Sequence, residues 1–582
     1  MSETNELEKE VPLANNDIEN PEQERKKQLF YLLSIWISII LVFTIIIVVI
    51  YIILNSETTE SNPDQEPKND TKPEPDIGPF TNSSLKALYD ISVIEKETLL
   101  FNDDLLDKIY SMSIDDKKVN KTNKYIFNDK GEHKLYIKFN ISLESAEYMF
   151  KNCTTLKEIE LSEFSTENIT TLVGMFYGCI NLISLNLTSF DTKNVINMSY
   201  LFYNCYSLKN ILLKEFDTSN VIDMKYMFSG CKSITSLNLK SFNTKKVKEI
   251  KYIFHDCNKL ENLQIGNNFI ISGITDLSGL FSDCFDLTTI DVSYIDTSNT
   301  NNMSQMFKGC IKITSIDLSR FDTSNVIDMN NMFSDCFSLT SINLTNFDTS
   351  NIEDMSGLFS DCSKLKELDV SNFDTSKVKN MDSLFYNCRL LTSLNLSNFN
   401  TSRVVSMHAM FSYCYLMETI DLSSFDTSKV ENMSYMFSFC QKLSSINLNN
   451  FNTQNVKDLQ DMFYGDSSLV NIDLSSFNTP NLLFIGRMFY NCNALTSLNI
   501  SNFDTSKVKS LVGIFSNCNN LNYIDIRNFN SKSLINVNEF IEKIFIGKPS
   551  NGIVYYNSNL FNKIIIDNIF GDWEKIDINK NF

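Results

Sequence analysis

Fourteen cysteines lie at nearly constant spacing along a chain of 582 residues. Successive cysteines are 26 residues apart, except for one interval of 27 and one of 52. The longest interval, between Cys440 and Cys492, has Asp466 at its middle. The chain therefore contains fifteen tandem copies of one unit. A fixed period of this length predicts a solenoid in which each copy forms one coil.

The repeated unit carries its own secondary-structure signals. A typical copy starts at Cys310 and reads C-IKITSIDLSRFDTSNVIDMNNMFSD. Its L-x-L step alternates apolar and polar residues, which predicts a short strand with both apolar residues facing inward. The V-x-x-M-x-x-M-F stretch favours an irregular or 3₁₀-like back wall over a full helix, because few residues remain in the coil. The D-T-S run between them is typical of a turn. We therefore predict an α/β-type repeat solenoid.

We call the residue at the place of the cysteine in each copy the cysteine position, which is occupied by Asp466 in one copy. A phenylalanine lies three residues before every cysteine position. When coils stack in register, these two columns should form an internal ladder. Its representative members are Cys179, Cys205, Cys231, Cys310, Cys336, Phe176, Phe307 and Phe333. Stacked cysteines come close enough for disulfides, and an even number invites that interpretation. The apolar neighbours favour the alternative, a column of buried free thiols. Asp466 must find backbone donors or a polar neighbour in that column, or it destabilises its coil.

The phrase MF-x-x-C-x-x-L-x-x-L-x-L-x-x-F-DTS-x-V resembles the BspA-like leucine-rich-repeat surface proteins in their 26-residue form. The resemblance covers about residues 145 to 531, in all copies of the unit. It implies a leucine-rich-repeat-like solenoid that is exposed on the cell and has a role in adhesion. That family has no shared catalytic residues, so the resemblance indicates a class of protein more than an activity.

An uncharged, mostly apolar segment, residues 29–54, predicts a transmembrane signal-anchor helix, since a membrane span needs about 20 such residues. Arg25, Lys26 and Lys27 precede it and acidic residues follow it, which places the N-terminus in the cytoplasm. Residues 1–28 would then be a cytoplasmic tail, and the solenoid would lie outside the plasma membrane. Residues 55–79 are rich in proline and acidic residues, which predicts a disordered stalk.

The remaining segments flank the repeats. We expect residues 80–145 to form an N-terminal cap, residues 146–531 the solenoid and residues 532–582 a C-terminal cap. Within the first cap, Ser84 to Met112 has a helical pattern and Tyr125 to Ile141 a strand pattern. The second cap has mixed helix and strand patterning with a late Trp573.

Signals of catalysis are scarce. The three histidines, His133, His255 and His408, have no metal-ligand spacing, and the sequence lacks the common nucleophile, phosphate-binding and dinucleotide motifs. We therefore expect no enzymatic activity, no metal and no cofactor. The net charge of −20 argues against nucleic acid as a partner.

A polar column runs along the predicted strands, seven residues after each cysteine position. Its members form a possible binding strip: Asp291, Asp317, Asn343, Asp369, Asn395, Asp421, Asn447, Asp473, Asn499 and Asp525. Asp and Asn alternate from Asp317 onward, which keeps stacked carboxylates apart or follows from duplication of a two-repeat block. The alternative is a strip that binds carbohydrate, an extended peptide or Ca²⁺.

Together these features predict a membrane-anchored surface protein that recognises external protein or glycan partners. Numerous Asn-x-Ser/Thr triplets, including Asn186 and Asn343, would permit glycosylation in a eukaryotic secretory route. The alternatives are a surface coat protein that self-associates, and an intracellular or lumenal scaffold if the topology is reversed.

Overall fold

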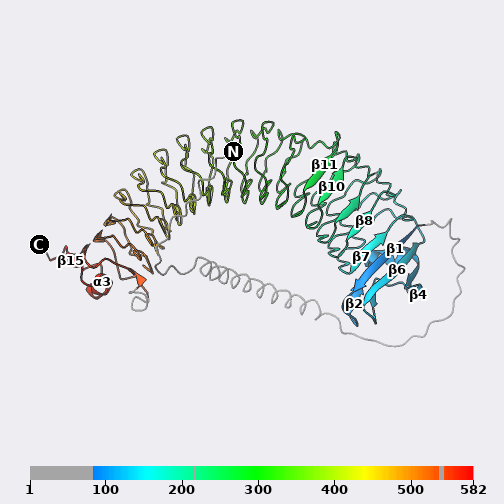
Figure 1. The fold of residues 1–582 in the computed structure, drawn as a ribbon, viewed down its shortest axis with the longest axis horizontal. Helices are drawn as coiled ribbons and strands as arrows, with labels where there is room; N and C mark the ends of the chain where they lie inside the picture. The colour runs from blue at the N-terminus through cyan, green and yellow to red at the C-terminus, as the bar shows by residue number, and fades with distance from the viewer. Residues whose placement is uncertain (1–82, 215, 536–542, 581–582) are drawn as a thin grey trace, which may run out of the picture. The chain divides into compact units, whose positions relative to one another are not determined.

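A computed structural model describes residues 83–214, 216–535 and 543–580. The predicted cytoplasmic tail, membrane helix and stalk lie outside these residues. No helix in the described part of the chain is long and apolar enough to cross a membrane. The described residues belong to one unit, Pro79–Phe582, in which consecutive coils lie side by side (Figure 1).

The solenoid begins against a five-stranded antiparallel sheet in the order β4-β3-β6-β1-β7. Its strands are β1 (Ser84–Ile91), β3 (Ile109–Ile114), β4 (Lys117–Val119), β6 (Gly131–Phe139) and β7 (Leu156–Glu160). A small sheet of β2 (Glu97–Leu99) and β5 (Lys124–Ile126) and a 3₁₀ turn, η1 (Asp103–Lys108), flank it. β7 is the first strand of the repeats, and β1 pairs with it antiparallel, so this sheet covers the end of the solenoid.

The predicted helix from Ser84 to Met112 is wrong, because this stretch forms β1, β2, η1 and part of β3. In β1 the buried side chains alternate, as Leu85, Ala87, Tyr89 and Ile91 face the core. A period of two fits a strand with one buried face. The strand predicted within Tyr125 to Ile141 is confirmed by β5 and β6.

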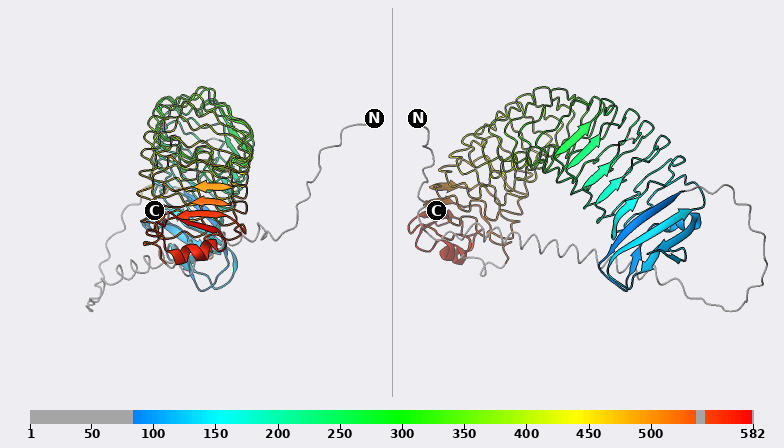
Figure 2. Two further views of the ribbon diagram at one scale, coloured as in Figure 1. Left: turned by 90° about the vertical axis from the view of Figure 1, so that its left-hand side faces the viewer. Right: turned by 45° about the vertical axis from the view of Figure 1, so that its right-hand side comes forward.

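The repeats form a β-solenoid with a spacing of 26 residues. Its L-x-L segments, which we call the strand row, form short parallel strands near both ends (Figure 2). These strands are β8 (Ser184–Asn186), β9 (Asn210–Leu212), β10 (Ser236–Leu239), β11 (Asn262–Ile265), β12 (Ser497–Asn499) and β13 (Tyr523–Asp525). The α/β assignment is too broad, because the back walls of the described coils consist of turns rather than helices.

The opposite side of each coil holds a second row of contacts, which we call the turn row. It comprises the residues from eight to one before each cysteine position. Residues five, three and one before that position donate backbone N–H groups to the next coil, at 2.6–3.2 Å throughout the repeats. Examples are Tyr148 to Val173, Phe150 to Met175 and Asn152 to Tyr177. The residues five and one before each cysteine position have positive φ throughout.

The core is a column of phenylalanine rings beside a column of thiols. Successive rings from Phe150 to Phe489 stack with centroids 5.4–6.1 Å apart. All fourteen cysteines are buried and unpaired. From Cys179 onward, each Sγ donates to a phenylalanine carbonyl of the preceding coil, as Cys336 does to Phe307 at 3.3 Å. Burial raises the pKa of the Cys336 thiol to about 12, so this thiol stays protonated.

Asp466 takes the place of a cysteine and is fully buried. Its Oδ1 accepts a hydrogen bond from the backbone N–H of Cys440 at 2.8 Å. Its Oδ2 has no hydrogen-bond partner among the described residues. Burial raises the pKa of this carboxyl well above its usual value, which favours the neutral acid.

The D-T-S threonine joins consecutive coils. Thr323 is buried, and its Oγ1 donates to the carbonyl of Asp348 at 2.9 Å. The same Oγ1 accepts from the backbone N–H of Asp348 at 2.8 Å. Equivalent threonines, such as Thr375 and Thr401, repeat both bonds. The threonine therefore satisfies backbone groups that a turn would otherwise leave without partners.

The C-terminal region continues the stack with degenerate coils. Strands β14 (Ile553–Tyr556) and β15 (Glu574–Asp577) extend the parallel sheet in the order β12-β13-β14-β15. Helix α3 (Lys563–Phe570) lies between them in sequence, and Asn562 caps its N-terminus. Trp573 is buried against Phe545 and Phe570. This mixture of helix and strand agrees with the expected pattern.

Candidate functional site

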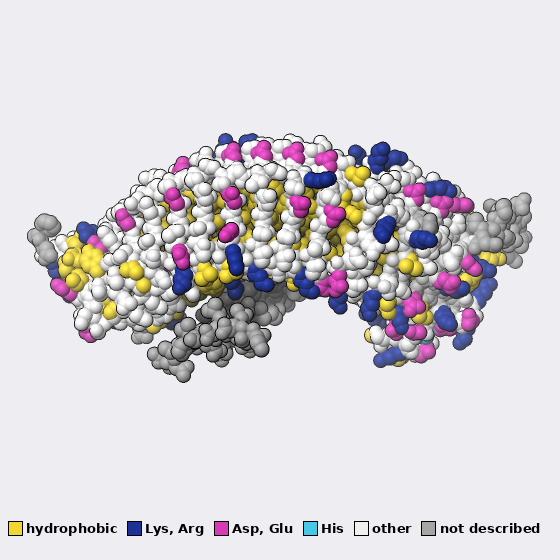
Figure 3. All heavy atoms as spheres, turned by 45° about the horizontal axis from the view of Figure 1, so that its top comes forward, with side chains coloured by type: hydrophobic (Ala, Val, Ile, Leu, Met, Phe, Trp, Pro, Cys, Tyr) yellow, Lys and Arg dark blue, Asp and Glu magenta, His cyan; other side chains and the backbone are white. Residues whose placement is uncertain are grey.

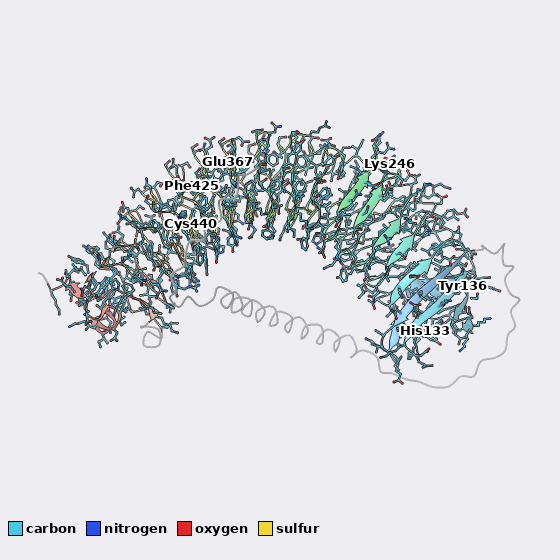
Figure 4. The ribbon with its side chains drawn as sticks, in the orientation of Figure 1. His133, Tyr136, Lys246, Glu367, Phe425 and Cys440 are labelled. Atoms are coloured by element: carbon cyan, nitrogen blue, oxygen red, sulfur yellow. The ribbon has the colours of Figure 1, made fainter. Side chains whose placement is uncertain are left out.

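The predicted strip lies on the strand row, and nine of its ten residues are exposed. Figure 4 labels side chains from the core and from the surface of the coils. Cys440 and Phe425 are buried, whereas Glu367 is exposed. The exposed strip residues are Asp291, Asp317, Asn343, Asp369, Asn395, Asp421, Asn447, Asp473 and Asn499. Acidic and basic side chains both occur along the face seen in Figure 3.

A local hydrogen bond explains why every strip position is Asp or Asn. Each Oδ1 accepts from the backbone N–H two residues later, at 2.9–3.2 Å. Asp317, for example, accepts from Ser319 at 3.0 Å. Hydrogen bonds from Ser319 lower the pKa of Asp317, and the other exposed aspartates of the strip have lowered pKa values too. The strip therefore presents fixed carboxylate and amide oxygens that stay ionised or polar in mild acid.

Asp525 does not belong to the exposed strip, which corrects the predicted set. Its side chain is 1 % exposed and is bonded by the guanidinium of Arg527. The strand pairing explains this difference, because β13 lies between β12 and β14 and Asp525 pairs with Tyr555. The degenerate coils that follow the repeats cover this end of the strip.

A hollow of about 510 Å³ adjoins the strand row at the N-terminal sheet. Leu88 and Tyr136 lie in it, and charged side chains of both signs surround them. Lys86 pairs with Glu160 across it at 3.2 Å. Lys134 and Glu158 lie on either side of Leu88, since both are register partners of that residue in neighbouring strands. Ser184 and Asn186 of β8 complete the lining, so the hollow is continuous with the strand row.

The turn row carries an aromatic patch that the sequence analysis missed. Its members, which we call the first aromatic patch, are Tyr148, Tyr177, Tyr200, Tyr203, Tyr226 and Tyr252. Tyr200 and Tyr226 stack with centroids 5.0 Å apart, and Tyr226 and Tyr252 at 5.1 Å. All six side chains are half-buried. Lys151 lies 4.4 Å from the Tyr148 ring centroid.

A second aromatic patch occupies the turn row of later coils, together with Tyr415, which directly follows Cys414. Its members are Tyr386, Tyr413, Tyr415, Phe439, Tyr464 and Tyr490. Arg389 lies 5.6 Å from the Tyr415 ring centroid and Arg487 5.7 Å from that of Tyr464. Between the patches, the corresponding positions hold small or polar residues such as Ser282, Gln305 and Ser334. The sequence signal was present, since tyrosine recurs five and two residues before the cysteines, but it was absent from the consensus.

The three histidines lie in different elements, with His133 in β6 and His255 and His408 in separate coils. Burial lowers the pKa of His133, but its hydrogen bonds to Asp115 and Asp129 more than offset this and raise the pKa above its usual value. His133 Nδ1 lies 2.7 Å from Asp115 Oδ2, which fixes the β3–β4 turn (Figure 4). His408 Nδ1 lies 2.7 Å from the hydroxyl of Ser434. Among the described residues, no group of His, Cys, Asp and Glu is arranged to hold a metal ion.

Solved structures that match the chain include a leucine-rich cell surface protein from Faecalibacterium prausnitzii, at 19 % identity. That match covers 67 % of this chain and 89 % of that one, with a TM-score of 0.28. The functional domain of InlJ from Listeria monocytogenes matches at 15 % identity and is described as including a cysteine ladder. That match covers 66 % of this chain and 73 % of that one, with a TM-score of 0.16. The Toll–Spatzle complex of Drosophila matches at 14 % identity over 65 % and 57 %, with a TM-score of 0.18.

No curated protein matches the chain. One family model matches it repeatedly, over residues 117–211, 180–288, 275–387, 354–469 and 438–546. These matches overlap without a gap and together cover residues 117–546, which is most of the chain. The chain therefore belongs to the family described as "Mycoplasma protein of unknown function, DUF285".

Proposed function

We propose that the chain is a membrane-anchored cell-surface protein whose solenoid binds external protein or glycan partners and has no catalytic role. The exposed strip carries this proposal. It presents one Asp or Asn per coil, and each side chain is held by a hydrogen bond to its own turn. Regular, pre-oriented polar groups on an extended surface suit recognition through many weak contacts. The apolar segment 29–54 supports anchorage.

The first test is topology. The full-length chain, tagged at both ends, is expressed in a mycoplasma host, and intact cells are treated with protease. Loss of the C-terminal tag with protection of the N-terminal tag is the expected result. Protection of the C-terminal tag would overturn the proposal in favour of an intracellular scaffold.

The second test is attachment. Cells that carry the full chain are compared with cells that lack it, for attachment to immobilised host-cell proteins and glycans. We expect attachment to depend on the chain. Equal attachment, together with self-association of the purified chain in sedimentation, would replace the proposal by a structural coat function.

A further inference from the structure

One of the two left-handed backbone positions in each coil of the turn row is restricted in composition, with few exceptions. The residue directly before each cysteine position has positive φ and is Gly, Asn or Asp in all coils except two. These residue types tolerate that conformation best, and a bulky residue there is an outlier. The two exceptions are Tyr413 (φ 61°) and Phe439 (φ 61°), both in the second aromatic patch. An aromatic residue therefore replaces the favoured residue type within a patch.

The first patch places tyrosines at the other left-handed position, five residues before the cysteine position, where the residue type varies between coils. Tyr148, Tyr200, Tyr226 and Tyr252 have φ between 52° and 59°. In other coils this position holds glycine, as at Gly357, or a residue with a smaller or flexible side chain, as at Ala409 and Arg487. The tyrosines are half-buried rather than core residues, so burial alone does not explain them. Residues kept in unfavourable backbone conformations are often retained for function.

We propose that the two aromatic patches form an interaction surface that binds an acidic segment of a partner protein. This inference rests on the proposed binding function and adds the surface and the class of partner. Tyrosine and arginine, like tryptophan, are enriched at the energetic centres of protein interfaces. The surface lies on the turn row and is therefore distinct from the strip on the strand row.

Ring geometry favours an acidic protein over a sugar. Tyr200, Tyr226 and Tyr252 stack on one another with interplanar angles of 6° and 2°, so neighbouring rings occupy the shared faces. Ring edges, which carry partial positive charge, and phenolic hydroxyl groups remain to contact a partner. Carboxylates and backbone carbonyls complement such donors, whereas a sugar that stacks needs a free ring face.

The cations beside the rings also favour an acidic partner. Lys151 and Arg389 are exposed, and neither forms an ion pair with another described residue. Lys225 and Lys251, by contrast, pair with Asp223 and Asp276 at 2.9 Å. Arg487 is exposed and pairs with the buried Asp461. The patches thus offer unpaired positive charge in a chain whose net charge is strongly negative.

The test uses the full-length chain purified in detergent and a fluorescent deca-glutamate peptide as the probe. In the variant Tyr200→Asn/Tyr226→Asn, Asn suits the positive φ while both rings are removed. We expect Kd for the peptide to rise about tenfold or more, with no fall in Tm. Gln305→Asn, at the same turn position (φ 57°) between the patches, is the matched control and should change neither quantity.

Several outcomes would overturn the inference. The wild-type chain could fail to bind deca-glutamate, or the double variant could bind it equally well. A fall in Tm that accounts for the lost binding would show that the tyrosines only support the coil. Tyrosine-dependent binding of heparin in place of the peptide would identify a sulfated glycan as the partner. If cells attach equally with wild-type and variant chains, this inference fails while the proposed function stands.

Discussion

The strand row and the turn row join the same coils, but they do so with unequal regularity. Between Ile265 and Ser497, the structure describes no strand in the L-x-L segments. Over the same coils the turn row keeps three backbone hydrogen bonds per coil, as from Gly309 to Ser334. The turn row also holds the stacked phenylalanines and, beside them, the thiols. Coil stacking in the middle of the solenoid therefore depends mainly on the turn row.

This difference also explains the compositions of the two rows. The strand row needs inward apolar residues and, at the strip position, an Asp or Asn that accepts a hydrogen bond from its own turn, whereas its other outer positions vary. The turn row needs two residues per coil with positive φ, and its N–H groups lie next to the following coil. A residue with a side chain that resists this conformation should therefore be far more disruptive there.

The largest expected effect comes from Gly309→Val in the turn row. Gly309 has φ +71°, and a Cβ atom there would lie 2.4 Å from Asp283 Oδ1. We expect a loss of roughly 2–4 kcal/mol in the free energy of unfolding, measured by urea denaturation. Ser315→Val on the exposed strand row is the control, with an effect within about 0.5 kcal/mol. Equal losses of unfolding free energy for the two variants would show that the turn row is no more sensitive to substitution than the strand row.

A second change tests the break in the thiol column. Asp466→Cys should stabilise the solenoid by about 1–3 kcal/mol at neutral pH, because it removes a buried polar oxygen without a partner. The raised pKa of Asp466 means that the folded state holds its proton more tightly than the unfolded state. Stability from this residue is complete below the unfolded pKa of about 3.9 and is lost as pH rises toward the folded pKa. Denaturation at several pH values should show this slope in the wild type and a smaller slope in Asp466→Cys. Equal slopes would contradict the assignment.

Thr323→Val should cost about 1–3 kcal/mol, because both backbone groups of Asp348 lose their buried partner. Valine has nearly the same shape, so packing is preserved. Thr314→Val, at an exposed position two residues before the L-x-L segment of the same coil, provides the comparison and should be nearly neutral in thermal denaturation. A neutral Thr323→Val would mean that water replaces the hydroxyl.

The smallest expected effect is in the strip. Asp369→Ala removes the hydrogen bond to the backbone N–H of Ser371, whereas Asp369→Asn keeps it. We expect a slightly lower Tm for the alanine variant and an unchanged Tm for the asparagine variant. A similar decrease in Tm for both variants would mean that the charge of Asp369, and not its hydrogen bond to the turn, stabilises the coil.

Much of the solenoid was predictable because period, strand alternation and column positions follow directly from repetition. Two features of the structure could not be predicted in this way. The consensus gives each position its commonest residue, so Tyr148 or Tyr413 at a turn position averages out, although the deviation marks a surface patch. The segment from Ser84 to Met112 forms strands because β6 and β7 supply partners on both sides of β1. Pairing with strands distant in sequence overrides local pattern.

The turn-row bonds have a consequence for biosynthesis. Each donor finds its acceptor in the very next coil, as Tyr148 does in Val173, 25 residues later. The threonine hydrogen bonds also join residues 25 positions apart, as between Thr323 and Asp348. A nascent chain can therefore complete each coil once the following one has emerged, without waiting for the C-terminus. Such stepwise growth limits the length of unfolded chain exposed at any moment, and with it the risk of aggregation.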